Sequence, residues 1–185
     1  MENPKFRKTL ITLHLLFAAF LTPSFLMLAL TGGNYLSGIK GSFEKTPLSL
    51  ASNAQLDFKK DDDILKEDII KLLEQSNITH KFEYVKNRGK IVQLRPTSRK
   101  YLELEQTPGG LKASWVQPSF QAGMMELHKG HGPTLFKTYQ KFVALGLLLV
   151  VLGGFLVGLL SKVYRRRTII TMILGTILFA LLMNA

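Results

Sequence analysis

Three stretches without a single charged side chain constrain this sequence more than any other feature. They cover residues 9–39, 142–161 and 168–185 and contain 31, 20 and 18 residues. A membrane core about 30 Å thick is crossed by roughly 20 apolar residues, because an α-helix rises about 1.5 Å per residue. The first two stretches reach that length, and the third comes close to it. The sequence therefore predicts three transmembrane helices.

Basic residues lie at the ends of these stretches, and they predict an orientation. Lys5, Arg7 and Lys8 precede the first stretch, and Lys162 with Arg165–Arg167 separates the second from the third. Cytoplasmic loops of membrane proteins carry an excess of lysine and arginine. Both basic groups fall on one side if all three helices cross. We therefore expect a cytoplasmic N-terminus and a central domain outside the cytoplasm.

The central region gives no sign of a nucleic-acid partner. The chain carries a net charge of +11, but residues 37–134 hold 15 Lys and Arg against 12 Asp and Glu. This region has no basic stripe and no aromatic RNA-binding motif, so we expect no nucleic acid as a partner. Cysteine is absent from the sequence, which excludes disulfides, iron–sulfur clusters and thiolate zinc sites.

The expected organisation has five consecutive segments. The first helix is interpreted as a retained anchor, because its apolar run is far longer than the roughly 7–15 residues of a signal-peptide core. The segments are the cytoplasmic N-terminus with the first helix (1–36), the exported domain with its linkers (37–133), the second helix (134–161), a basic cytoplasmic turn (162–167) and the third helix (168–185).

One helix is predicted in the exported domain directly after Asp61–Asp63. The aspartates suit the start of a helix, where a side chain caps free N–H groups and negative charge is favourable. Asn77 is expected to end the helix. The residues between them place apolar side chains on one helical stripe, namely Ile64, Leu65, Ile69, Leu72 and Leu73.

The pattern after this helix changes to strict alternation, which predicts strands. Turn signals at 87–90 and 108–110 divide the region into three or four antiparallel strands, the first of which includes His80. We expect an α+β domain in which one helix lies on an antiparallel meander. The expected core is the helix stripe with Phe82, Tyr84, Val92, Leu94, Leu102, Leu104, Leu111 and Trp115.

The segments on either side of this domain are expected to be connections. Residues 37–60 are rich in turn formers and are interpreted as a linker, with one short strand at 54–58. Residues 117–141 are interpreted as the connection to the second transmembrane helix.

His14 is the first candidate for a functional side chain, because it lies within the first apolar stretch. A polar group within lipid is costly unless it meets a partner, so such residues often serve a function. The alternative is an interfacial histidine bonded to a neighbouring helix or to a lipid headgroup.

His128 and His131 are the second candidates, near the outer end of the second transmembrane helix. Their i,i+3 spacing places both on one face if the helix begins early, and two imidazoles with Glu126 suit zinc, copper or iron. Gly130, Gly132 and Pro133 favour instead a polar loop at the membrane interface. The sequence leaves both interpretations open.

Glycines in the second transmembrane helix predict close helix packing. Gly154 and Gly158 form a small-xxx-small pair, and Gly146 and Gly153 lie seven positions apart near the same face. Small residues let two helices approach closely within a membrane. We expect this face to pack against a helix of the same chain or of a second copy.

Motifs of common enzyme classes are absent. The sequence contains no HExxH, GxSxG, P-loop or GxGxxG pattern, and Asp61–Asp63 lacks the spacing of an EF-hand. We predict no catalytic residue, and the sequence favours a protein that is not an enzyme.

Four short motifs, in this order, resemble the PepSY-associated transmembrane family. They are Leu13-His14, Leu30-Thr31-Gly32, Leu127-His128-x-Gly130 and the run Leu145–Leu149. The resemblance covers most of residues 8–161 and implies that the central domain is similar to a PepSY domain. Larger members of that family resemble ferric-siderophore reductases and hold b-type haem between pairs of histidines. This chain has fewer helices and only four histidines.

Two functions are expected from these features. The first is a membrane-anchored accessory protein, without a cofactor, that binds a protein or peptide partner and packs into a membrane complex. The alternative is a haem-binding electron-transfer subunit that assists ferric-siderophore reduction and iron uptake. About 30 Å of helix separate His14 from the outer end of its span, so haem would be shared between subunits through His14 and His128 or His131.

The expected location is the inner membrane of a bacterium, with the central domain periplasmic or extracellular. The expected partners are membrane lipid and either another protein or a second copy of the chain.

Overall fold

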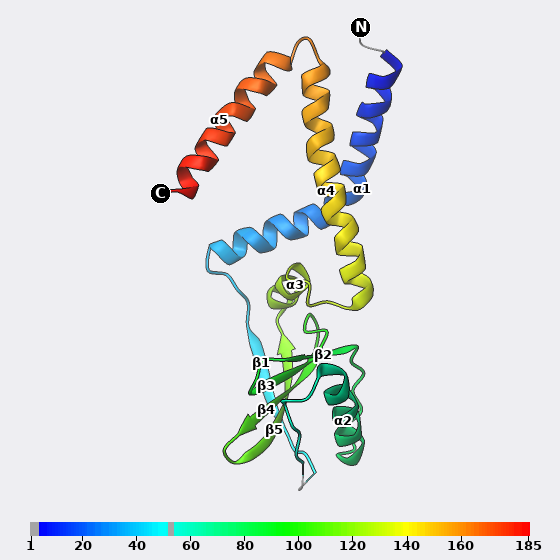
Figure 1. Cartoon of the computed structure of the whole chain (residues 1–185), viewed down its shortest axis with the longest axis vertical. Coiled ribbons are helices and arrows are strands. Elements are labelled where there is room, and N and C mark those ends of the chain that lie inside the picture. The colour runs from blue at the N-terminus through cyan, green and yellow to red at the C-terminus, as the bar shows by residue number, and fades with distance from the viewer. Residues whose placement is uncertain (1–3, 52–53) are drawn as a thin grey trace. The chain divides into compact units, whose positions relative to one another are not determined.

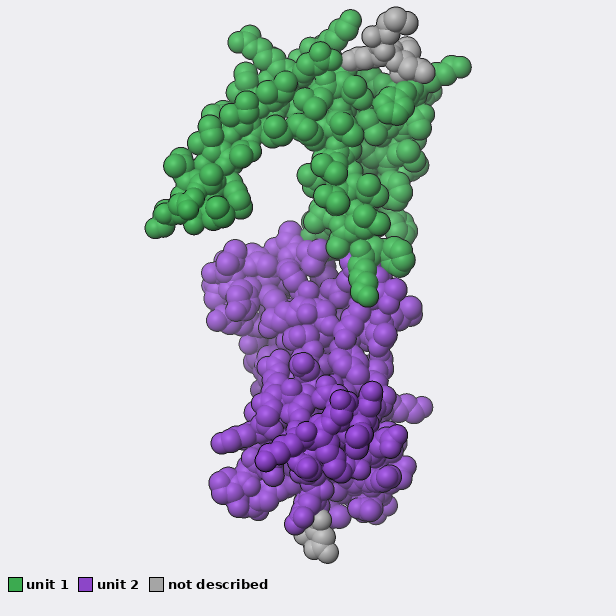
Figure 2. Space-filling view, in the orientation of Figure 1, with its two compact units in different colours: residues 1–26, 141–185 green, residues 27–140 purple. Residues whose placement is uncertain are grey.

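The computed structural model describes residues 4–51 and 54–185, and it divides the chain into two compact units. Residues 1–26 and 141–185 form the first unit, and residues 27–140 form the second (Figure 2). The second unit contains every strand that the described residues form, together with the last turns of the first helix.

Three helices have the length and apolar composition needed to cross a membrane (Figure 1). They are α1 (Pro4–Leu36), α4 (Thr134–Leu160) and α5 (Arg165–Met183). This confirms three helices of spanning length. The basic turn is shorter than predicted, because α5 begins at Arg165. Arginine is a good helix former, and its charged end can reach the interface from a first helical turn.

Five antiparallel strands form one sheet in the order β1-β5-β4-β3-β2. They are β1 (Phe43–Leu48), β2 (Tyr84–Asn87), β3 (Ile91–Arg95), β4 (Tyr101–Thr107) and β5 (Gly110–Pro118). Strands β2 to β5 form the predicted meander with its predicted turns. Gly89 and Gly110 occupy those turns with φ of 82° and 109°, a region that glycine enters easily.

Strand β1 was not predicted, and its residues were interpreted as a linker. It pairs with β5, so that Phe43 lies opposite Pro118 and Leu48 opposite Ala113. The short strand expected at 54–58 is wrong, because this segment has no strand structure. The first five residues of β1 are exposed. An exposed edge strand lacks apolar alternation, so its pairing with a distant strand leaves little local signal.

Helix α2 (Asp62–Gln75) confirms the predicted helix and its start. Asp61 is the N-cap, and its side chain accepts a hydrogen bond from the N–H of Asp63 at 3.2 Å. The helix ends next to Asn77, which has a φ of 53°. Asparagine tolerates this left-handed conformation better than most residues, which explains why the chain turns here.

The core lies between α2 and one face of the sheet. Most of its predicted members are present, but Val85 takes the place expected for Tyr84, because β2 begins at Tyr84 and its alternation is shifted by one residue. His80 precedes this strand and is not part of it. Phe82, Leu111 and Trp115 are only partly buried. The buried core residues are Phe58, Leu65, Ile69, Leu73, Val85, Val92, Leu94, Leu102, Leu104 and Ala113.

Helix α3 (Phe120–His128) was also not predicted, because residues 117–141 were interpreted as a connection. Ser119 is its N-cap, and the Ser119 hydroxyl accepts from the N–H of Ala122 at 3.3 Å. Three of its side chains are buried, namely Ala122, Met125 and Glu126. Its close approach to Ser98 brings it to the end of the sheet, on the face that α2 leaves open.

Candidate functional site

His14 and the predicted glycines meet within the first unit. A Cβ built on Gly153 would lie 3.4 Å from His14 Nδ1, and one on Gly154 would lie 3.1 Å from His14 Cε1. A Cβ built on Gly146 would likewise meet the side chain of Leu21. Because 14 and 21 are seven apart, as are 146 and 153, one face of α1 packs along one face of α4. The partner of this glycine face is therefore a helix of the same chain.

The last predicted glycine has a different neighbour. A Cβ on Gly158 would lie 2.9 Å from Cγ2 of Thr168, in the second turn of α5. Gly158 thus allows the turn between α4 and α5 to close tightly. No residue of α5 is buried in the described part of the chain.

His128 lies at the end of α3 and contacts the last turns of α1. Its Nδ1 lies 2.6 Å from the hydroxyl of Thr31, which itself donates to the carbonyl of Met27 at 2.6 Å. The Thr31 oxygen therefore accepts the hydrogen bond from His128. A second polar contact joins the same two elements, because the amide of Asn34 donates to Gln121 at 3.2 Å.

His131 belongs to a different group, centred on Glu126. Both the His131 Nδ1 and the Thr97 hydroxyl donate to Oε2 of Glu126, at 2.7 and 2.6 Å. The N–H of Thr97 also donates to the carbonyl of His131 at 3.1 Å. His128 and His131 thus have separate partners. Across residues 4–51 and 54–185, no group of three or more His, Asp or Glu side chains is arranged to hold a metal ion.

Burial and hydrogen bonding set the charges of this group. Burial alone raises the pKa of Glu126, but hydrogen bonds from Thr97 and His131 outweigh it and hold that pKa below its usual 4.5. Burial lowers the pKa of His131 below 6.5, although its bond to Glu126 opposes this. Near neutral pH, Glu126 is therefore a carboxylate and His131 a neutral donor.

A pocket of about 430 Å³ opens beside this group on the polar face of the sheet. We use polar face for the side opposite α2, where Lys45, Gln93, Arg95, Tyr101 and Glu103 project. The pocket, called the polar pocket below, is lined by seven ionisable side chains, namely Lys45, Arg88, Tyr101, Glu103, Glu126, Lys129 and His131, together with Phe43 and Gln93.

The two acids of the polar pocket have partners. Glu103 forms an ion pair with Lys45 and accepts a hydrogen bond from the Gln93 amide at 3.1 Å. Oε2 of Glu126 accepts hydrogen bonds from Thr97 and His131, and Nζ of Lys129 lies 3.4 Å from its Oε1. Between the acids lies the buried Tyr101, whose pKa is raised by burial and by both carboxylates.

Arg95 is the buried basic residue of this face. It is 4% exposed, it lies opposite Tyr84 in the β2–β3 ladder, and its charge lowers the pKa of His131. Its Nε is buried and has no hydrogen-bond partner. Sequence reasoning missed Arg95, Thr97 and Glu126 as a group. The available signal was alternation, which places Arg95 and Glu103 on the face opposite Leu94 and Leu102.

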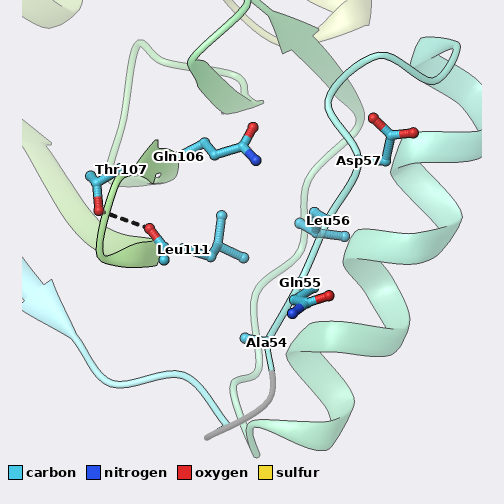
Figure 3. A pocket seen from close by; sticks show the side chains of 8 residues that line it. Ala54, Gln55, Leu56, Asp57, Gln106, Thr107 and Leu111 are labelled. Carbon is cyan, nitrogen blue, oxygen red and sulfur yellow. Dashed lines mark hydrogen bonds between the residues drawn. The ribbon is translucent and has the colours of Figure 1, made fainter.

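A larger pocket of about 710 Å³ lies at the hairpin between β4 and β5 (Figure 3). Leu56 and Leu111, which pack partly against the core, face each other across it. Asp57 is its only ionisable lining residue among those described. This pocket therefore has none of the convergent charges that mark the polar pocket.

Comparison with protein-family models, with curated proteins and with solved structures finds no match for this chain. The resemblance to the PepSY-associated transmembrane family therefore stays a prediction.

The open edge of β1 completes the set of candidate sites. The N–H of Ser119 donates to the carbonyl of Ser42 at 2.9 Å, just before β1. Hydrogen-bonding direction alternates along an antiparallel strand, so Glu44 and Thr46 bond toward β5 while Phe43 and Lys45 point away. Pro47, which lacks an N–H, falls on the outward side, where proline is tolerated.

Proposed function

We propose that this chain is a non-catalytic, membrane-anchored accessory protein that binds a protein or peptide partner outside the cytoplasm along the edge of β1. The observation that carries the proposal is an edge strand with exposed residues and outward-pointing backbone groups. Unpaired strand edges bind extended peptides by adding a strand to the sheet.

The other edge of the sheet is a weaker candidate. Strand β2 has only four residues, and backbone carbonyls near it already accept hydrogen bonds from side chains. The amide of Asn87 donates to the carbonyl of Phe58, and the ammonium of Lys66 donates to the carbonyl of Glu83 at 2.7 Å. The β1 edge is the longer and more accessible of the two.

The proposed accessory role fits the arrangement of the chain. Three apolar helices are compatible with a membrane protein, and the basic residues favour a cytoplasmic N-terminus. The domain between α1 and α4 would then face the outside of the cytoplasmic membrane. A PepSY-like identity of the domain remains part of this proposal.

The proposal is tested with Lys45→Pro in the full-length protein. Proline removes the outward N–H of residue 45 and leaves the bonds from Glu44 and Thr46 to β5. Lys45→Ala is the matched control, because it removes the side chain and keeps that N–H. A photo-reactive amino acid at Glu44 records contacts of the edge in intact cells.

We expect an adduct of defined mass with the wild type and with Lys45→Ala, and its loss with Lys45→Pro. An adduct at twice the mass of the chain would identify a second copy as the partner. The proposal fails if no adduct forms, or if Lys45→Pro gives the same adduct as the control.

His14 favours the second candidate function, a haem-binding electron-transfer subunit. Its Nδ1 is buried and has no hydrogen-bond partner. His128 and His131 lie in the other unit, and their Nδ1 atoms contact Thr31 and Glu126, which leaves each Nε2 as the atom that could bind iron. In this proposal a second copy supplies the other ligand, because about 30 Å of helix separate His14 from the far end of its span.

An absorption spectrum of the purified protein separates the two functions. A Soret band that is lost in His14→Ala would favour the haem-binding subunit. A colourless preparation from haem-replete cells would favour the accessory function over the haem-binding one.

A further inference from the structure

The last turns of α1 belong to the unit of the sheet rather than to the helical unit. Residues 27–36 fall in the second unit, whereas residues 9–26 fall in the first. Residues 9–26 alone supply about 27 Å of helix, which is close to the roughly 30 Å of a membrane core. The charge-free run nevertheless continues to Ile39. The chain therefore has more apolar helix here than one crossing needs.

These last turns have two different faces. One face packs against α3, because Thr31 is buried where it contacts His128 and Asn34 donates to Gln121 (Figure 1). Leu36, by contrast, is 88% exposed. Helix α3 thus holds the last turns through polar contacts and leaves an apolar side chain of the same turns uncovered.

Two further exposed apolar side chains lie close to this end of α1. The side-chain amide of Gln121 accepts from Asn34 at 3.2 Å and donates to the carbonyl of Ile39 at 3.4 Å. The side chain of Ile39 is 56% exposed, and that of Phe120, next to Gln121, is 83% exposed. We call Leu36, Ile39 and Phe120 the apolar rim.

The segment that carries Ile39 is held against the first turn of α3. The N–H of Ser42 donates to the hydroxyl of Ser119 at 3.0 Å, and the N–H of Ser119 donates to the carbonyl of Ser42 at 2.9 Å. Between them and Ile39 lies Gly41, with a φ of 77°, where a Cβ would lie 2.5 Å from the backbone nitrogen of Ala122. The fold therefore fixes the apolar rim in its exposed position.

Positive charge lies directly beside the apolar rim. The ammonium groups of Lys40 and Lys129 lie 5.2 and 6.0 Å from the centre of the Tyr35 ring. Lys129 also contacts Glu126, whereas Lys40 forms no ion pair with any residue that the structure describes. Tyrosine and lysine beside apolar residues are typical of the boundary between membrane and water.

We propose that the apolar rim inserts into the headgroup region of the membrane leaflet that the sheet domain faces, with Lys40 beside the phosphates of anionic phospholipids. Amphipathic surfaces with lysine on their polar side bind at this depth. Lipid is the occupant because the rim continues the charge-free run of α1 and because Lys40 has the charge that anionic lipid attracts. Pro23 inside α1 allows the helix to change direction before the rim.

This inference rests on the membrane anchoring in the proposed function and does not depend on its peptide partner. It is tested with single cysteines in the full-length protein, each labelled with a fluorophore whose emission shifts to the blue in apolar surroundings. The protein is held as one copy in bilayer discs of phosphatidylcholine and phosphatidylglycerol. Part of the phosphatidylcholine carries a nitroxide quencher near its headgroup. The labelled variants are Phe120→Cys and Ile39→Cys on the rim, Leu147→Cys in α4 and Lys112→Cys in β5.

We expect blue-shifted emission that the nitroxide lipid quenches at Ile39→Cys, Phe120→Cys and Leu147→Cys, and neither effect at Lys112→Cys. Quenching at Leu147→Cys without quenching at the two rim positions would overturn the inference and leave the membrane anchoring in place. Loss of quenching at Leu147→Cys as well would overturn the anchoring itself. A blue shift without quenching at the rim would show that protein covers it, and would also overturn the inference.

The role of Lys40 is tested in the labelled Phe120→Cys protein. Lys40→Gln should lower the ratio of docked to undocked domain about fivefold, the effect of one lysine near an anionic surface, and quenching should fall accordingly. Omission of phosphatidylglycerol should have the same effect. Lys112→Gln is the matched control, because it makes the same charge change in the exposed part of β5 and should leave the quenching unchanged. Equal quenching in Lys40→Gln and Lys112→Gln would overturn the contact of Lys40 with anionic lipid.

Discussion

Two histidines of the sheet domain, His80 and His131, have pKa values that their surroundings lower. Burial and the charges of Arg99 and Lys100 lower the pKa of His80, which also contacts the ring of Trp115 at 5.0 Å. His131 has a lowered pKa for a related reason, its burial. The fold therefore favours the neutral form of both imidazoles, so each binds a proton more readily in the unfolded chain.

This imbalance predicts a pH dependence of stability. Both folded pKa values lie below 6.5, so the unfolded chain binds more protons, and the free energy of unfolding falls as pH falls below 6.5. The unfolding midpoint should decrease between about pH 7.5 and about pH 5.5. Emission from Trp115, the single tryptophan, reports unfolding of this domain in detergent.

His80→Phe should reduce this decrease, because the ring contacts are kept while the titrating group is removed. Lys112→Gln changes no group that titrates in this range and should retain the decrease of the wild type. An unchanged midpoint in the wild type over the whole range would contradict the explanation.

Helix α3 is the element that joins the sheet to the last turns of α1. On one side Glu126 meets Thr97, and on the other His128 meets Thr31. Its position depends on one close approach, since a Cβ on Gly123 would lie 2.7 Å from the backbone oxygen of Ser98. A backbone oxygen cannot move aside as the end of a flexible side chain can.

Gly123→Ala is therefore expected to destabilise the domain by about 1–3 kcal/mol, the usual cost of overpacking. Gly109→Ala is the control, because its nearest neighbour, Thr107 Oγ1, would lie at 3.9 Å, an ordinary contact. The control should stay within about 0.5 kcal/mol of the wild type. Denaturant unfolding followed by Trp115 emission measures both. Equal stability of the two variants would show that α3 shifts freely.

The molecule as a whole combines a helical unit that carries most of the net positive charge with a domain of nearly balanced charge. In the first unit α1 packs on α4 through small residues, as expected where lipid supplies no hydrophobic force between helices. The exposed apolar surface of α5 suits contact with lipid. From the basic residues around Arg166 we predict that the turn between α4 and α5 lies in the cytoplasm.

Single cysteines test this topology, because the sequence has none of its own. Lys112→Cys lies in β5 of the domain, and Arg166→Cys lies at the start of α5. A membrane-impermeant maleimide should label Lys112→Cys in intact cells and Arg166→Cys only after permeabilisation. The cysteine-free chain controls for background labelling, and the reverse pattern would refute a cytoplasmic N-terminus.

Local features of the sequence determined the three spanning helices, the capped helix α2 and the hairpins of strands β2 to β5. Charge-free runs, the Asp61 cap and the glycine turn at Gly89 each act through neighbours close in the chain. For this reason the pattern of a single segment was enough to predict them. The glycine spacing in α4 also marked its packing face, although it left the identity of the partner helix open.

Only the tertiary structure decided which distant groups meet. Strand β1 forms by pairing with β5, and α3 forms over a sheet face that the sequence pattern does not assign to any partner. The group of Thr97, Glu126 and His131, the buried Arg95 and the contact of His14 with Gly153 depend on the same long-range packing. Such contacts are fixed by the free energy of burying and pairing whole elements, which no short segment carries.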